Sequence, residues 1–238
     1  MTELSPASAD RLAHAFQRCR DMEGTLGQRL QAYAAAGRDF FPAYSDAVDR
    51  LVVRLRESGG GENAPKPGEP MPPFLLPDET GRLVSLESLI RRGPAIVMFY
   101  RGHWCPYCRL NVGSVIQARN EIEALGGQVV AILPETQKYA QQFKSDSGAP
   151  FPVLTDLDNG YALSLNLAIW LGAEIQQLLS HLDLADFHGN DGWVLPIPAT
   201  FVVGRDGIVK ARFVDPDFRK RMEIADLIAA VREAAEKR

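Results

Sequence analysis

Apolar residues in the first part of the chain recur at the spacing of an α-helix. From residue 12 to residue 33 they follow one another at steps of three, four or seven: Leu12, Phe16, Cys19, Leu26, Leu30 and Tyr33. This stripe predicts one long amphipathic helix that ends near Gly37. A second helix follows, with an apolar face formed by Tyr44, Val48, Leu51, Val52 and Leu55. We therefore expect a helical hairpin over residues 1–57, which needs the rest of the chain or a second subunit to cover its apolar faces.

Glycine and proline interrupt this pattern over residues 58–73. Proline lacks a backbone donor and glycine favours irregular backbone, so neither a helix nor a central strand tolerates so many of them. We expect this segment to be a linker. It would separate the helical extension, residues 1–57, from a second domain, residues 74–238.

Beyond the linker, continuous apolar runs alternate with helical periodicity. Residues 95–100 and 128–133 predict strands buried on both faces, with a helix over 106–125 between them. A helix over 135–146, a short strand at 152–154, a helix over 159–171 and a helical pattern around 175–182 follow. Residues 199–203 and 208–213 flank an Asp-Gly turn and predict a hairpin, and the last helix covers 221–236. This order predicts an α/β domain with a mixed central sheet flanked by helices.

Composition and charge narrow the possible functions. The 238 residues are 46% hydrophobic and 24% charged, which is ordinary for a globular protein. A net charge of −4 argues against a nucleic-acid surface. The chain has neither an apolar run long enough to span a membrane nor a signal peptide at its start, so we expect a cytoplasmic protein without a membrane partner. It has no glycine-rich phosphate loop either, and we expect no cofactor.

Two of the three cysteines form the most informative motif. Cys105 and Cys108 follow the buried strand over 95–100, at the edge of the sheet where chemistry collects in α/β folds. Cys105 would lie at a helix N-terminus, whose free N–H groups and dipole favour a thiolate. Arg101, His103 and Arg109 could lower its pKa further. Cys108 lies one turn later and within disulfide reach, so one cysteine can attack and the other can resolve the product.

The segment Trp-Cys-Pro-Tyr-Cys after a strand resembles the thioredoxin fold, and Cys-Pro-Tyr-Cys is typical of glutaredoxins. The wider frame resembles the peroxiredoxins of the AhpC/TSA (alkyl hydroperoxide reductase and thiol-specific antioxidant) family, over residues 68–235. The matching stretches are 72–78, 81–86, 95–100, 151–156 and 198–207. The resemblance implies a thioredoxin-like fold, to which the helical hairpin is an extension.

Two positions depart from the peroxiredoxin pattern. Gly102 stands where the family usually has threonine or serine, three residues before the reactive cysteine. Pro198 stands where the family supplies an arginine, and it instead resembles the cis-proline that faces the active site in thioredoxins. Ile197–Pro198 is therefore a candidate cis bond, and Arg101 is a candidate substitute for the missing arginine.

The sequence is compatible with three functions. The first is a thiol-dependent peroxidase that reduces hydrogen peroxide or organic hydroperoxides through Cys105, with Cys108 forming an intramolecular disulfide that thioredoxin or a glutaredoxin–glutathione system reduces. The second is a thiol-disulfide oxidoreductase that acts on protein or glutathione disulfides. The third is a redox sensor or scaffold. The candidate substrate-binding residues are Arg101, His103, Trp104, Tyr107, Ile197 and Pro198.

The same residues allow other roles. His103 and the two motif cysteines could supply three zinc ligands, but no second ligand pair completes the site, so we expect no metal. Cys19 lies on an apolar stripe and is expected to pack in the core. The helical hairpin favours a homodimer.

Overall fold

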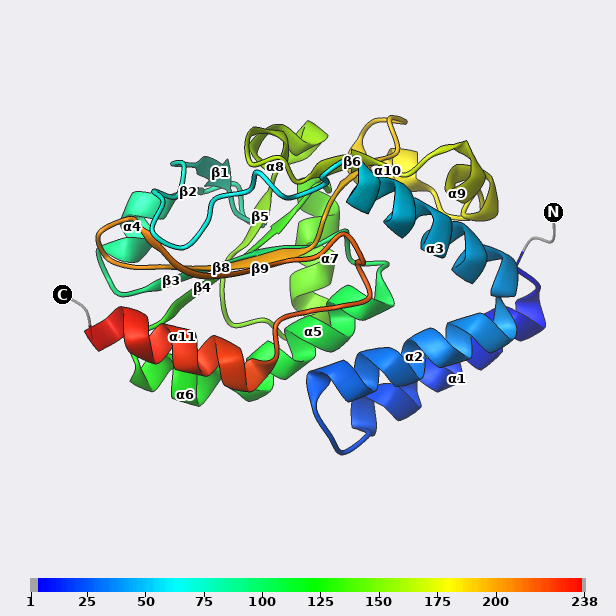
Figure 1. Cartoon of the computed structure of the whole chain (residues 1–238), viewed down its shortest axis with the longest axis horizontal. Helices are drawn as coiled ribbons and strands as arrows, with labels where there is room; N and C mark the ends of the chain where they lie inside the picture. The colour runs from blue at the N-terminus through cyan, green and yellow to red at the C-terminus, as the bar shows by residue number, and fades with distance from the viewer. Residues whose placement is uncertain (1–3, 237–238) are drawn as a thin grey trace.

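The structure, a computed structural model, describes residues 4–236, and a five-stranded mixed sheet forms its centre (Figure 1). The strand order is β5-β4-β3-β8-β9. β3 (Ala95–Phe99), β4 (Gln128–Leu133) and β5 (Val153–Thr155) are parallel, whereas β8 (Ala199–Val203) pairs antiparallel with β3 and with β9 (Val209–Val214). This is the mixed sheet that the sequence predicts.

The central strand β3 is buried on both faces because its side chains alternate between two hydrophobic cores. Ile96 and Met98 belong to the first core, which α5 (Pro106–Gln117), α6 (Arg119–Ala124), α7 (Gln137–Ser147) and α11 (Ile224–Glu236) help to form. Val97 and Phe99 belong to the second core. α4 (Leu86–Ile90), α8 (Gly160–Ser164) and the segment before β1 (Leu75–Pro77) cover that face.

Several predicted helices have different boundaries in the structure. The helix expected over 106–125 is two helices that meet at Ala118, and the last helix begins at Ile224 instead of residue 221. The helix expected over 159–171 is wrong for most of its length. Asn159 and Asn166 have positive φ angles of 58°, so the backbone turns at both points. Only η1 (Leu157–Asn159) and α8 are helical there, and the chain then forms a strand.

That strand, β6 (Ala168–Trp170), pairs antiparallel with β7 (Val194–Pro196). Between them lie two short helices, α9 (Ala173–Leu178) and α10 (Leu184–His188). β2 (Leu83–Ser85) pairs with β1 in a separate small sheet. The chain runs almost directly from β7 into β8, and the N–H of Ile197 donates to the carbonyl of Leu167 at 2.7 Å. The expected cis bond before Pro198 is wrong: the bond is trans, as suits a chain that stays extended there.

The N-terminal region contains three helices where a hairpin of two was expected: α1 (Pro6–Asp21), α2 (Leu26–Phe40) and α3 (Pro42–Glu57). The predicted long helix breaks because Thr25 caps α2. Its hydroxyl accepts from the N–H of Gln28, whose side chain in turn accepts from the N–H of Thr25. A capping box starts a new helix even though the apolar stripe continues across the break.

These helices pack against the sheet-bearing part of the chain, beside α5 (Figure 1). Buried residues of α1–α3 and of α5 belong to one continuous core. The N–H of Gly27 in α2 also donates to the carboxylate of Glu223, just before α11, at 2.8 Å. The apolar stripe is therefore covered within the same chain. The homodimer, which was expected from this stripe, stays a prediction.

The segment predicted as a linker is ordered. Ala64 and Met71 are buried in the second core, and the N–H groups of Gly68 and Met71 donate to carbonyls at the β8–β9 hairpin. Proline and glycine shape this segment into turns that lie along the domain.

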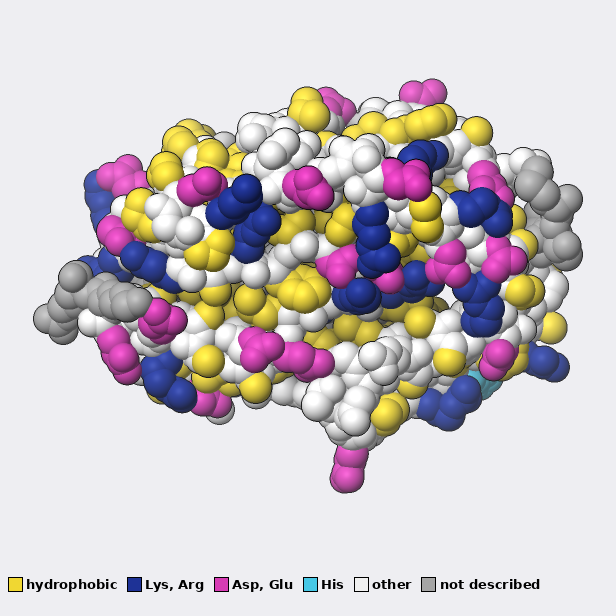
Figure 2. Space-filling model, in the orientation of Figure 1, with side chains coloured by type: hydrophobic (Ala, Val, Ile, Leu, Met, Phe, Trp, Pro, Cys, Tyr) yellow, Lys and Arg dark blue, Asp and Glu magenta, His cyan; other side chains and the backbone are white. Residues whose placement is uncertain are grey.

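On the face shown in Figure 2, Lys and Arg side chains are interspersed with Asp and Glu.

Candidate active site

Cys105 lies where β3 has ended and α5 begins. It is the N-cap residue of α5, Pro106 occupies the first helical position, and the N–H of Cys105 donates to the carbonyl of Gly102 at 3.2 Å. Proline at this position costs no helical hydrogen bond. The helix dipole at this end favours a negative charge on the sulfur. The local structure is the one that the motif predicts.

Cys105 and Cys108 are free thiols, fully buried, and hydrogen-bonded to each other. The sulfur of Cys108 also accepts from the backbone N–H of Arg101 at 3.4 Å and from the guanidinium of Arg221 at 3.5 Å. Burial opposes ionisation of Cys105, but the hydrogen bond from Cys108 and the charges of Arg101 and Arg221 outweigh it. They lower the pKa of Cys105 from 9.0 to about 6. Burial and the neighbouring thiolate raise the pKa of Cys108, so the pair divides into one thiolate and one thiol.

Arg101 is a buried arginine beside both sulfurs, with only 2% of its surface exposed. Its guanidinium lies 3.8 Å from the ring centre of Phe218 and 5.1 Å from that of Trp104, and it donates to the hydroxyl of Tyr44 in α3. Its Nη2 atom is buried and has no hydrogen-bond partner among residues 4–236. The charged guanidinium of Arg101, next to the thiolate, can therefore donate one more hydrogen bond.

The loop before Cys105 is held by a buried carboxylate. Glu135, which follows β4 and has no exposed surface, accepts from the backbone N–H of His103 at 2.9 Å and contacts its ring Nδ1 at 2.7 Å. The imidazole of His103 stacks on Tyr139, with ring centres 4.8 Å apart. Burial lowers the pKa of the nearby His188 to about 4, with the charges of Arg101 and His103 adding to the shift. His103 thus orients the loop and faces Glu135 instead of the sulfurs.

Gly102 leaves no room for the threonine or serine that the peroxiredoxin pattern would place there. Its φ is +146°, and a Cβ atom would lie 2.5 Å from the Nε1 of Trp104 and 2.6 Å from the carboxylate of Glu135. Only glycine fits this backbone without a rearrangement. The departure from the usual pattern therefore follows from how Glu135 and Trp104 pack around the loop.

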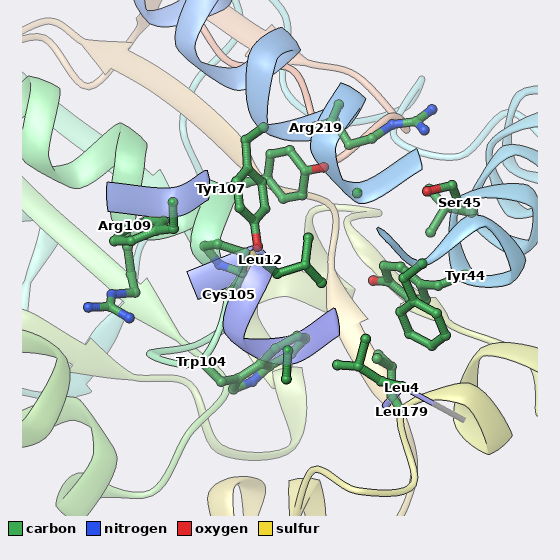
Figure 3. A pocket seen from close by; sticks show the side chains of 18 of the residues that line it. Leu4, Leu12, Tyr44, Ser45, Trp104, Cys105, Tyr107, Arg109, Leu179 and Arg219 are labelled. Atoms are coloured by element: carbon green, nitrogen blue, oxygen red, sulfur yellow. The ribbon is translucent and has the colours of Figure 1, made fainter. Parts of the chain in front are cut away.

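A cavity of about 340 Å³ lies over Cys105 (Figure 3). Side chains of α1, α2 and α3 form much of its wall, with Leu12 close to Cys105 in the view. Arg101, Trp104 and Tyr107 complete the side next to the motif. Tyr107 packs edge-on against Tyr33 of α2, with ring centres 5.2 Å apart. The N-terminal helices thus cover the reactive sulfur and leave a mostly apolar chamber above it.

The structure brings together some of the predicted site residues and separates others. Arg101, Trp104 and Tyr107 line the cavity with Cys105, whereas His103 lies in a neighbouring cavity. Ile197 and Pro198 line neither of these, and Ile197 belongs to the core on the other face of the sheet. Cys19 is buried in the first core.

Three contributors were missed: Tyr44, Glu135 and Arg221. Glu135 alone had a usable signal, because it follows β4 and so lies at the same sheet edge as the motif. Tyr44 and Arg221 reach the site only through tertiary packing. Among residues 4–236 no group of histidine, cysteine or acidic side chains could hold a metal ion, and no helix is long and apolar enough to cross a membrane.

Comparison with known proteins decides the family. The model of the AhpC/TSA family matches residues 67–212, more than half of the chain. The chain belongs to the AhpC/TSA family. The matched region contains both motif cysteines of this AhpC/TSA protein but not the helices α1–α3.

Two relatives and one solved structure illustrate what this AhpC/TSA protein is similar to. It is 29% identical to the thiol:disulfide interchange protein DsbE of Pseudomonas aeruginosa over 150 residues, 62% of the chain and 66% of the relative. It is 30% identical to the chloroplastic peroxiredoxin Q of Sedum lineare over 92 residues, 39% of the chain and 49% of the relative. The crystal structure of peroxidoxin BcpB from Mycobacterium tuberculosis superposes with a TM-score of 0.56 at 21% identity, covering 71% of the chain and 97% of BcpB. That superposition confirms the thioredoxin-like fold. The two relatives are matched over only 49% to 66% of their own lengths.

Proposed function

We propose that this protein is a thiol-dependent peroxidase that reduces hydroperoxides through Cys105. The observation that carries the proposal is the position of Cys105, which has no exposed surface and lines a cavity of about 340 Å³ whose wall includes side chains of α1–α3. A hydroperoxide fits such a chamber. A disulfide on the surface of another protein cannot reach the sulfur unless α1–α3 move away.

The chemistry uses the two thiols in sequence. The thiolate of Cys105 attacks one oxygen of the O–O bond, the bond breaks, and the second oxygen takes up a proton and leaves as an alcohol or water. Cys105 becomes a sulfenic acid. The thiol of Cys108 then attacks this sulfur, a disulfide forms and water leaves. A cellular thiol or dithiol reduces the disulfide, and thioredoxin or a glutaredoxin–glutathione system is the proposed source.

Arg101 supplies the charge that this step needs. Arg101 lines the cavity, and its buried Nη2 has no hydrogen-bond partner among residues 4–236, so we propose that the guanidinium donates to a peroxide oxygen as negative charge develops. The family pattern places such an arginine on another strand, where this chain has Pro198. We propose that Arg101 substitutes for it.

The second candidate function is thiol-disulfide exchange, which the similarity to DsbE and the Cys-Pro-Tyr-Cys motif favour. Its first step would need the same low-pKa thiol. The cover formed by α1–α3 is the feature that argues against it for protein substrates.

The test follows the fate of each sulfur. Reduced protein and its Cys105→Ser, Cys108→Ser and Cys19→Ser variants are mixed with stoichiometric hydrogen peroxide or cumene hydroperoxide, and products are identified by mass. We expect a disulfide in the unmodified protein and in Cys19→Ser, a sulfenic acid in Cys108→Ser, and no fast reaction in Cys105→Ser. Oxidation no faster than that of a free thiol, together with rapid reduction of insulin, would instead establish the disulfide oxidoreductase.

A further inference from the structure

A second cavity, of about 130 Å³, lies beside the one over Cys105 and is rich in arginine. Helices α1, α2, α5 and α7 contribute to its wall, and we call it the arginine pocket. Its charged lining consists of Arg20, Arg29, Arg109, Asp146 and His103. His103 is already paired with Glu135, so three guanidinium groups face a single carboxylate.

Two of these arginines form no ion pair with any of residues 4–236. Arg29 donates weakly to the side-chain oxygen of Gln117 at 3.4 Å, and its Nε is buried without a partner among residues 4–236. Arg109 is exposed and stacks on Phe16 at 4.7 Å, and within the same residues it forms no ion pair. Arg20 alone is paired, with Asp21 at 2.8 Å. The lining of the pocket therefore has a net positive charge and guanidinium groups that are free to donate hydrogen bonds.

The arginine pocket is close to the reactive sulfur. Arg109 lies one turn after Cys105 on α5, and its N–H donates to the carbonyl of Cys105 at 3.1 Å. Arg109 and Phe16 line both cavities, so they form part of the wall between them. In Figure 3 the guanidinium of Arg109 points away from Cys105, which fits a role on the side of the arginine pocket. An anion held there would lie within the length of a small molecule from Cys105.

We propose that the arginine pocket binds the carboxylate of a small molecule that reacts at the cysteine pair. The planar guanidinium fork matches a carboxylate with two parallel hydrogen bonds, and a pocket of this size takes one such group. Two reactants carry this chemistry: a hydroperoxide with a carboxylate, or a small thiol with a carboxylate. If the ligand is the hydroperoxide, the inference rests on the proposed peroxidase function; if it is the thiol, it does not.

Neither reaction needs an oxidant or reductant besides these small molecules and the two cysteines. The carboxylate-bearing hydroperoxide oxidises Cys105 and leaves as the corresponding alcohol. The thiol attacks the Cys105–Cys108 disulfide as its thiolate, one cysteine leaves as a thiol after protonation, and a mixed disulfide forms. A second thiol then releases the other cysteine, and the reductant departs as its own disulfide.

The experiment compares matched acids and esters in two arms. In the oxidation arm, a fatty-acid hydroperoxide and its methyl ester oxidise the reduced protein. In the reduction arm, 3-mercaptopropionate and its methyl ester reduce the oxidised protein, with rates expressed per thiolate. Each arm uses the unmodified protein, Arg29→Gln, Arg109→Gln and Arg232→Gln. Arg232 is a matched control because it is half exposed, pairs with Glu121 at 3.2 Å and does not line the arginine pocket.

The acid-to-ester rate ratio is the measurement, because it cancels any general effect of a substitution on the thiols. We expect it to fall about fivefold in Arg29→Gln and Arg109→Gln, the effect of one partly exposed ion pair, and to stay unchanged in Arg232→Gln. Added salt should lower the ratio of the unmodified protein as well. Arg109→Gln keeps the test valid if Arg29→Gln folds poorly, because Arg109 is exposed.

The two arms separate the outcomes. If the acid-to-ester rate ratio of the arginine variants falls in the oxidation arm, the hydroperoxide is the ligand. If it falls in the reduction arm, the thiol is the ligand. Unchanged ratios in both arms overturn the inference, even if the peroxidase itself is fast. If no hydroperoxide reacts faster than it does with a free thiol, the proposed function fails, while a fall in the reduction arm still supports the arginine pocket.

Discussion

Arg101 donates a hydrogen bond to the hydroxyl of Tyr44, and this contact joins the N-terminal helices to the cysteine motif. Arg101 lies four residues before Cys105, and Tyr44 belongs to α3, which the AhpC/TSA family match does not include. A charge that lowers the pKa of the reactive thiol is therefore positioned by a part of the chain that lies outside the family match.

Removing this contact should affect both stability and reactivity. In Tyr44→Phe the buried guanidinium loses a partner, and we expect the free energy of unfolding to fall by about 1–2 kcal/mol. We also expect slower oxidation of Cys105, because Arg101 is less well fixed. Urea unfolding and stopped-flow oxidation measure the two effects. Tyr161→Phe is the control: it loses a hydrogen bond to the carbonyl of Pro72 on the other face of the sheet, and it should leave the oxidation rate unchanged.

The pH dependence of Cys105 reactivity tests the role of Arg101 directly. Because the pKa of Cys105 is lowered to about 6, its reaction rate should rise as pH increases through 6 and stay constant at higher pH. In Arg101→Gln the thiolate loses a neighbouring positive charge while burial remains, so the midpoint should move up toward 9.0. The alkylation rate of Cys105 by iodoacetamide, resolved by mass, gives both profiles.

Arg82→Gln serves as the control for that shift, since the side chain of Arg82 is 81% exposed and pairs with Asp78. Its profile should match that of the unmodified protein. An unchanged midpoint in Arg101→Gln would show that Arg101 does not set the pKa of Cys105 and would leave Cys108, Arg221 and the helix dipole as its causes.

Glu135 should matter for the geometry of the loop that precedes Cys105. In Glu135→Gln one of the two buried acceptor oxygens becomes an amide donor, so a hydrogen bond to His103 is lost. We expect the free energy of unfolding to fall by about 1–3 kcal/mol and Cys105 oxidation to slow. Glu121→Gln changes a carboxylate that is 52% exposed, and should alter neither quantity. Equal stability of the two variants would contradict a structural role for the buried carboxylate.

The cavity wall should distinguish large from small hydroperoxides. Leu12→Trp places a large ring in the chamber over Cys105, and we expect the rate with cumene hydroperoxide to fall at least about tenfold. Hydrogen peroxide needs little of this space, so its rate should fall much less. Val53→Trp is the control, because Val53 is 53% exposed on α3. Parallel losses for both peroxides would mean that Leu12 supports the motif instead of shaping the chamber.

Local patterns predicted the central part of the fold and the core of the site. The apolar run of β3, the Cys-Pro-Tyr-Cys motif and the start of α5 follow from short-range signals, and the structure places them as expected. The prediction of one long N-terminal helix failed because the apolar stripe continues across the capping box at Thr25. The spacing of apolar residues indicates which face of a helix is buried, but it does not indicate whether the helix continues without a break.

The rest of the site depends on contacts between distant parts of the chain. Arg221 reaches the sulfur of Cys108 across 113 residues, and Glu135 reaches His103 across 32. A single sequence contains no periodicity that reports such pairs. The sequence marks Gly102 only as a departure from the family pattern, and its tight packing against Trp104 and Glu135 could not be predicted from it.

The hydrogen bond between Gly27 and Glu223 has a consequence for biosynthesis. It joins residues 196 positions apart, and the helix that it anchors is part of the cover over Cys105. The ribosome makes α1–α3 before residue 223, so this anchor cannot form until residue 223 has emerged. A nascent chain that has not reached residue 223, or one truncated before it, would therefore carry its reactive thiol without this anchor.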